Sequence, residues 1–246
     1  MINQRFDTPS PVRLDLRLPL ANAEITTTDK PESTVVVTGP QRMLDATKVE
    51  LDGDRLLVEI QRKLFGGFGH RFNGEQLRVE ITVPARSRVE IASAAGDGVL
   101  DGTFDRVVVK SASGALTATG EILGDAVIQT VSGNIRLPRV GGDLRAASVS
   151  GNVAAGEVGG SVVAKSVSGD VRVASVREGR VEVQSVSGNV EVGIAGGTNL
   201  DVDASTASGT LSSEVPLSGT RNAKQGPTVV VRGKTVSGDV RLYRAA

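Results

Sequence analysis

The stretch Ser166-Val167-Ser168-Gly169-Asp170-Val171 decides the fold, because close copies of it recur along the second half of the chain. Each copy places an apolar residue between two hydroxyl residues and then a glycine, and the other copies begin at Ser111, Thr130, Ser148, Ser185, Thr206 and Thr235. Their glycines are residues 114, 133, 151, 169, 188, 209 and 238, so the steps between them are 19, 18, 18, 19, 21 and 29 residues. A near-constant period of this length indicates a repeat protein made of stacked units.

Each period also contains a second, glycine-containing turn, such as Gly141-Gly142-Asp143 or Gly159-Gly160-Ser161. One unit is therefore a strand, a Ser-Gly-Asn/Asp turn, a second strand and a second turn. In the unit that begins at Arg180, the alternation of strand side chains predicts four inward valines. These are Val181, Val183, Val190 and Val192.

Two architectures can be built from such units. In a parallel β-solenoid each period is one coil and the same turn lies above itself in every coil. In an antiparallel meander each period is a hairpin, and so many short strands must close into a wide barrel or split into two sheets. A wide barrel needs large side chains to fill it, whereas this chain offers Val, Ala and Ser. We therefore predict an all-β fold, a single-stranded parallel β-solenoid with coils of 18–19 residues.

Residues 1–92 show strand alternation without an evident copy of the repeat. Val12–Leu18 alternates as a half-buried strand that Pro19 closes. Further strands are predicted at Glu24–Thr27, Thr34–Thr38, Lys48–Leu51, Arg55–Gln61 and Gln76–Val83. We expect residues 1–92 to cap one end of the stack and residues 93–246 to form the repeat solenoid, the two being continuous. Residues 214–227, which interrupt the last repeats, read as a loop or terminal cap.

The composition excludes several classes of function. Twenty-eight basic residues balance 28 acidic ones, which gives no electrostatic footprint for nucleic acid. The chain has no cysteine and hence no disulfide or thiolate site. No stretch resembles a secretory signal or an integral membrane segment, so we expect a cytoplasmic protein.

The glycine of each repeat supplies a positive φ at a coil corner, and the Asn or Asp that follows it forms a column that satisfies backbone amides. A calcium column is the functional alternative, which the mixture of Asn and Asp disfavours. We therefore assign these residues a structural corner role and expect no metal and no cofactor. The corner residues are Gly114, Gly133, Asn134, Gly151, Asn152, Gly169, Asp170, Gly188, Asn189, Gly209, Gly238 and Asp239.

The two hydroxyl residues of each copy flank an apolar residue, as Ser166 and Ser168 flank Val167. A bend at the first serine would turn the valines inward and leave the serines exposed, and we favour this arrangement because it hides the valines. The alternative buries serines that bond to each other or to the backbone. An exposed ladder of hydroxyls also resembles the arrays of insect ice-binding proteins, although the longer coil and the lack of disulfides argue against ice binding.

One candidate partner-binding loop lies between two of the N-terminal strands. It carries Phe65, Phe68, His70, Arg71 and Phe72, and exposed aromatic residues beside cations are typical of interfaces. The alternative is a long hairpin tip whose phenylalanines fold back on the sheet.

Enzyme chemistry finds little support in the sequence. The chain has a single histidine, and its acidic residues are scattered over strand faces without the aromatic platforms of carbohydrate-active β-helix enzymes. No phosphate-binding loop is present. We therefore predict that the protein is not an enzyme and has no catalytic residues.

The Ser-Val-Ser-Gly-Asn/Asp-Val repeats, preceded by Val79–Pro84 and Val89–Ile91, resemble the bacterial putative-adhesin β-strand-repeat family, or toastrack domain. The resemblance implies a solenoid-like fold, no known catalytic residues and frequent association with membrane-linked stress or signalling systems. The predicted function is a non-enzymatic scaffold in the bacterial cytoplasm that binds an unidentified protein partner. An exported cell-surface adhesin is the alternative, and self-association through exposed solenoid edges is a further possibility.

Overall fold

The computed structural model describes residues 1–60, 76–215 and 227–245. Nearly all the elements in these ranges are β-strands, and the exception is the short helix α1 (Gln41–Asp45). Within the same ranges no helix is long and apolar enough to cross a membrane. The chain forms two compact units, Met1–Gly120 and Glu121–Ala246.

The unit Glu121–Ala246 consists of coils that contribute one strand to each of two parallel sheets. In stacking order, the first sheet contains β13 (Ala126–Ser132), β15 (Leu144–Ser150), β17 (Val162–Ser168), β19 (Gly179–Ser187), β23 (Thr228–Ser237) and β21 (Asn199–Ser208). The second sheet contains β12 (Glu121–Ile122), β14 (Ile135–Val140), β16 (Val153–Val158), β18 (Val171–Val176), β20 (Val190–Ile194), β24 (Val240–Arg244) and β22 (Leu211–Ser213). The predicted parallel β-solenoid is confirmed.

The core of this unit is the narrow space between the two sheets. It is filled by small and β-branched side chains, which suit a thin interior. The four valines expected to point inward, Val181, Val183, Val190 and Val192, are each at most 1% exposed. Strand alternation therefore predicted the core positions of the repeat correctly.

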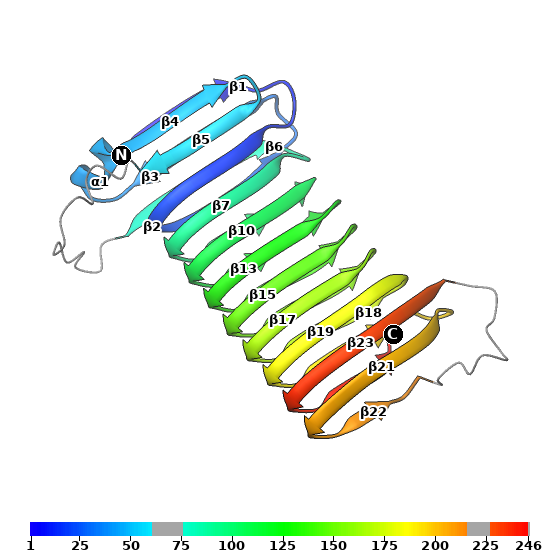
Figure 1. Ribbon diagram of the computed structural model, residues 1–246. Helices are drawn as coiled ribbons and strands as arrows, with labels where there is room; N and C mark the ends of the chain where they lie inside the picture. The colour runs from blue at the N-terminus through cyan, green and yellow to red at the C-terminus, as the bar shows by residue number, and fades with distance from the viewer. Residues whose placement is uncertain (61–75, 216–226, 246) are drawn as a thin grey trace. The chain divides into compact units, whose positions relative to one another are not determined.

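The coils of this unit do not stack in the order of the sequence. Strand β23 lies between β19 and β21, as Figure 1 shows, because Ser187 and Ser208 both pair with Ser237. In the same way β24 lies between β20 and β22. The coil that ends the chain is thus inserted into the stack, and the coil of β21 and β22 forms the end of the stack.

The unit Met1–Gly120 has the same two-sheet plan. Its parallel strands are β2 (Arg13–Thr28), β5 (Arg55–Ile60), β6 (Leu77–Pro84), β7 (Arg88–Ala95), β8 (Gly98–Asp101), β10 (Arg106–Ser113) and β11 (Leu116–Ala118), and β9 (Thr103–Phe104) is a short strand of the same unit. Three strands pair antiparallel at one end of this unit, namely β1 (Ile2–Asp7), β3 (Glu32–Thr38) and β4 (Thr47–Asp52). Of these strands, β3 lies beside the parallel strand β6 and β4 lies beside the parallel strand β5. The predicted division at residue 92 falls within β7.

Strand β2 corrects one sequence prediction. Pro19 does not close the strand, which continues to Thr28 and passes from one sheet to the other. Its first half pairs with β5 and β7, and its second half pairs with β6 and β8. β2 is therefore a complete coil between two others, and Figure 1 shows it between β5 and β7.

Candidate interaction surface

The predicted corner glycines all lie where the chain passes from one sheet to the other, and all have positive φ. At Gly169 φ is +131°, and a Cβ atom there would lie 2.3 Å from the carbonyl oxygen of Gly151 in the preceding coil. No side chain can occupy that space, because the atom in the way belongs to the backbone. The corner therefore requires glycine for two reasons, its positive φ and the close approach of the preceding coil.

The predicted Asn/Asp residues form a hydrogen-bond ladder along the same corner. The Asp170 amide donates to Asn152 Oδ1 at 2.9 Å, and the Asn189 amide donates to Asp170 Oδ1 at 2.8 Å. The ladder continues through the inserted coil, since the Asp239 amide donates to Asn189 Oδ1 at 3.0 Å. These side chains satisfy backbone amides that no strand pairing reaches, which is a structural use of the residues.

A ladder residue of the same type that was not predicted lies in the unit Met1–Gly120. Asn22 Oδ1 accepts a hydrogen bond of 2.9 Å from the Asp97 amide. Leu18–Ala23 therefore occupies the place of a repeat copy in which alanine replaces the glycine and both hydroxyl residues are lost. The only feature of the motif left in the sequence was Asn22, which follows a regularly alternating strand pattern.

The orientation predicted for the serine and valine columns is wrong. Ser166 is 6% exposed, whereas Val167 is 48% exposed and Ser168 faces solvent. The strand keeps its alternation through the first hydroxyl residue, because Ser166 pairs with Ser148 and Ser185 in the neighbouring strands. The bend comes only after the valine, so that the valine points outward.

The buried hydroxyls of three successive coils have no hydrogen-bond partner among residues 1–60, 76–215 and 227–245. They belong to Ser148, Ser166 and Ser185, which are 5–6% exposed. A buried hydroxyl without a partner costs about 1–3 kcal/mol relative to water.

We expect the triple substitution S148A/S166A/S185A to raise the free energy of unfolding by about 3 kcal/mol or more, because it removes three hydroxyl groups from the core that each cost about 1–3 kcal/mol. Urea denaturation followed by circular dichroism measures the change. The matched control is S150A/S168A/S187A on the exposed serines of the same coils, which should change stability by less than about 0.5 kcal/mol. A loss of stability in the first variant would show that these hydroxyls do find partners.

Outward valines form a continuous apolar line, which we call the valine ladder. Its members are Val131, Val149, Val167, Val186 and Val236, which are 53%, 47%, 48%, 49% and 55% exposed. They lie on β13, β15, β17, β19 and β23, which are neighbours in the stack. Because β23 is inserted next to β19, Val236 extends the ladder directly beyond Val186.

The corner itself does not require valine at this position. In the unit Met1–Gly120 the corresponding residues of the repeat are Ala94 and Ala112, and in the terminal coil the residue is Ala207. Alanine therefore suffices wherever only the turn has to be made. The five valines are a property of one part of the stack.

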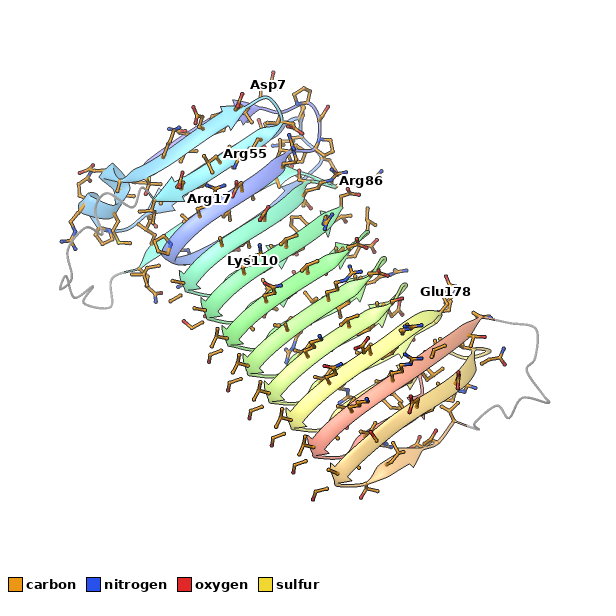
Figure 2. All side chains as sticks on the ribbon, viewed as in Figure 1. Asp7, Arg17, Arg55, Arg86, Lys110 and Glu178 are labelled. Atoms are coloured by element: carbon orange, nitrogen blue, oxygen red, sulfur yellow. The ribbon has the colours of Figure 1, made fainter. Side chains whose placement is uncertain are left out.

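The lowered carboxylate pKa values belong to surface ion pairs of the unit Met1–Gly120. Partial burial would raise the pKa of Asp15, but hydrogen bonds from Arg55 and Arg17 outweigh it and lower that pKa. Figure 2 labels both arginines on neighbouring strands. A hydrogen bond from Arg13 lowers the pKa of Asp54. Carboxylates held ionised in this way are poor general acids at neutral pH.

Metal binding likewise has no support among residues 1–60, 76–215 and 227–245, which contain no group of three or more His, Asp or Glu side chains placed to hold an ion. The predicted partner-binding loop with Phe65, Phe68, His70, Arg71 and Phe72 lies outside the described residues. The valine ladder is therefore the candidate site that the structure offers.

Comparisons with known proteins agree with the fold. Residues 13–243 match the family model Toastrack DUF4097. A solved structure of a "putative adhesin" from Bacteroides fragilis NCTC 9343 is similar, with a TM-score of 0.57 and 14% identity over 98% of this chain and 96% of that chain. A "putative adhesin" from Parabacteroides distasonis ATCC 8503 has a TM-score of 0.53 and 14% identity over the same shares of the two chains. No curated protein matches the sequence. At this identity the two structures bear on the fold alone.

Proposed function

Because the chain belongs to the Toastrack DUF4097 family and folds as its β-solenoid, we propose that it is a non-enzymatic scaffold that binds a protein through the valine ladder. The observation that carries the proposal is the half-exposure of five stacked valines. Burying apolar surface drives protein association, and the largest contiguous apolar patch of a soluble protein, typically a few hundred Å², is often a functional site.

The ladder also has the form of a binding surface. Its rungs are held by parallel pairing on both sides, so the valines keep fixed positions with a spacing of about 4.8 Å. A surface that is ordered before binding loses little conformational entropy when a partner covers it. The exposed serines next to the valines, such as Ser168, supply a polar rim.

We expect a photo-crosslinking amino acid at position 167 to capture a protein in the native bacterium, because Val167 is the middle rung of the ladder. Adding V149K and V186K to the same chain should abolish the capture, since lysine ammonium groups resist burial in an apolar contact. The matched control carries the crosslinker at Leu123, an exposed apolar residue of the same unit outside the ladder. Equal capture from positions 167 and 123, or none from 167, would contradict the proposal.

The proposal places the scaffold in the bacterial cytoplasm and links it to envelope stress or signalling. Fractionation of the native bacterium tests the location, and recovery on the cell surface would favour the adhesin alternative. The identity of the captured protein tests the link to stress signalling.

A further inference from the structure

Two polar columns flank the valine ladder. One lies two residues before each valine on the strand, and the other lies three residues after it, beyond the corner. The first column consists of Gln129, Ala147, Lys165, Gln184 and Lys234, and the second consists of Asn134, Asn152, Asp170, Asn189 and Asp239. All of these side chains are exposed except Ala147, which is half-buried.

The charges of the two columns match coil by coil. Lys165 and Asp170 belong to one coil, and Lys234 and Asp239 belong to another. In the other three coils the second column has a neutral asparagine, and there the first column is also neutral. A cation and an anion therefore lie on opposite sides of the valine in the same two coils.

These four charged side chains form no ion pair with one another or with other described residues of the unit Glu121–Ala246. The ion pairs of the described part of the unit Glu121–Ala246 join Arg139 to Glu121 and Glu157, Arg145 to Asp143, Arg172 to Glu191 and Arg241 to Glu214. Neither lysine takes part, and the two aspartates accept backbone hydrogen bonds through Oδ1. Both lysines are thus available to a group outside the chain.

We propose that the occupant of the valine ladder is a second copy of this chain, related by a twofold axis that runs along the ladder. Such an axis keeps each coil opposite the same coil of the partner and exchanges the two flanks. Lys165 then faces Asp170 of the partner subunit, and Lys234 faces Asp239 of the partner subunit. Each contact occurs twice by symmetry. This inference rests on the proposed function, because it names the partner of the same surface.

The opposite orientation is disfavoured by the same charges. A twofold axis across the ladder would bring each flank against itself. Lys165 would then face Lys165 of the partner subunit, and the two Asp170 side chains would also meet. Like charges at a contact act against an alternative arrangement, as in the flanking charges of coiled coils. The charge pattern therefore selects the parallel dimer.

A second copy also matches the ladder in its spacing. Identical side chains repeated at the strand spacing pack well against a surface with the same repeat, as in the interfaces between paired β-sheets. Five half-exposed valines provide a few hundred Å², less than the roughly 800 Å² per partner of a stable interface. The dimer is therefore weak, with a dissociation constant between about 10 μM and 1 mM.

Sedimentation equilibrium of the full chain at low salt tests the pairing. We expect a monomer–dimer equilibrium that V167K weakens by about tenfold or more, whereas L123K leaves it unchanged. A chain that is monomeric at about 1 mM, or that is affected equally by both substitutions, overturns the inference. Urea denaturation of each variant verifies that the monomer is folded.

Reversing the lysine charges tests whether the lysines of one copy face the aspartates of the other. K165E/K234E should weaken the dimer by about tenfold, because glutamate then faces aspartate. Adding D170N/D239N to this variant should strengthen the dimer, whereas D170N/D239N alone should weaken it. Asparagine keeps the corner hydrogen bond, as Asn152 and Asn189 do. If D170N/D239N acts with the same sign in both backgrounds, the lysines and aspartates do not meet across the interface and the inference fails.

Cysteine crosslinking tests the orientation, and the chain has no cysteine of its own. In the parallel dimer V149C faces itself, so a short bis-maleimide should link two copies of this variant. In the opposite orientation V149C would link only to V186C when the two variants are mixed, which would overturn the proposed axis. If the chain is monomeric but a crosslinker at 167 captures another protein, the inference fails and the proposed function stands. If the chain is monomeric and a crosslinker at position 167 captures no protein, both the inference and the proposed function fail.

Discussion

Gly169→Ala is expected to lower the free energy of unfolding by about 3–5 kcal/mol. The φ of +131° is strained for any residue with a Cβ atom, and the new Cβ would lie 2.3 Å from the carbonyl oxygen of Gly151. That oxygen is held in place, because the Gly151 amide donates a hydrogen bond to the carbonyl oxygen of Ser168. Urea denaturation followed by circular dichroism measures the loss.

Gly196→Ala is the matched control. Gly196 also lies in a turn of the unit Glu121–Ala246, but its φ is outside the strained positive range and a Cβ atom there meets nothing within 4 Å. Alanine at this position should change the free energy of unfolding by less than about 1 kcal/mol. Equal effects at the two positions would show that the corner does not depend on the close approach of successive coils.

The sequence predicted the corner well because the corner is a local feature. Glycine followed by Asn or Asp has one physical explanation at a recurring turn, and Gly169 with Asp170 fits it. Strand alternation is equally local, which is why Val181 and Val183 were assigned to the core correctly. These two signals define the β-solenoid.

The direction of the valines could not be read from the same pattern. Hiding Val167 seemed favourable in isolation, because its apolar surface is larger than that of a serine. The structure instead preserves the pairing of Ser166 with its neighbours and accepts a buried hydroxyl without a partner. This pairing turns the valines outward and creates the valine ladder. The candidate site could not be predicted from one repeat, because it depends on how neighbouring coils pack.

The order of the coils is the second feature that the sequence concealed. Repeats that share one pattern can pair in the same register with any other copy, and only nearest-neighbour contacts distinguish the possible orders. The 29-residue step between Gly209 and Gly238 was a sign of irregularity, but the length of a step does not show in which order the coils pair. The loop or cap predicted at residues 214–227 lies mostly outside the described residues.

The coil order makes a prediction of large effect, which compares Val231→Asp with Val202→Asp. The two valines are register partners on β23 and β21. Val231 is 1% exposed and is paired on its other side with Val181, whereas Val202 is half-buried in the terminal coil. We expect Val231→Asp to cost about 4 kcal/mol or more and Val202→Asp about 1–2 kcal/mol, measured by urea denaturation.

This comparison is decisive because a stack in sequence order would reverse it. In that order β21 would lie inside the stack with Val202 fully covered, and β23 would form the end with Val231 half-open. Val231→Ala and Val202→Ala give the same comparison with smaller losses, about 2 and less than 1 kcal/mol, in case an aspartate prevents folding. A larger loss at Val202 in either pair would also remove Val236 from its place beside Val186, and the valine ladder would then end one rung earlier.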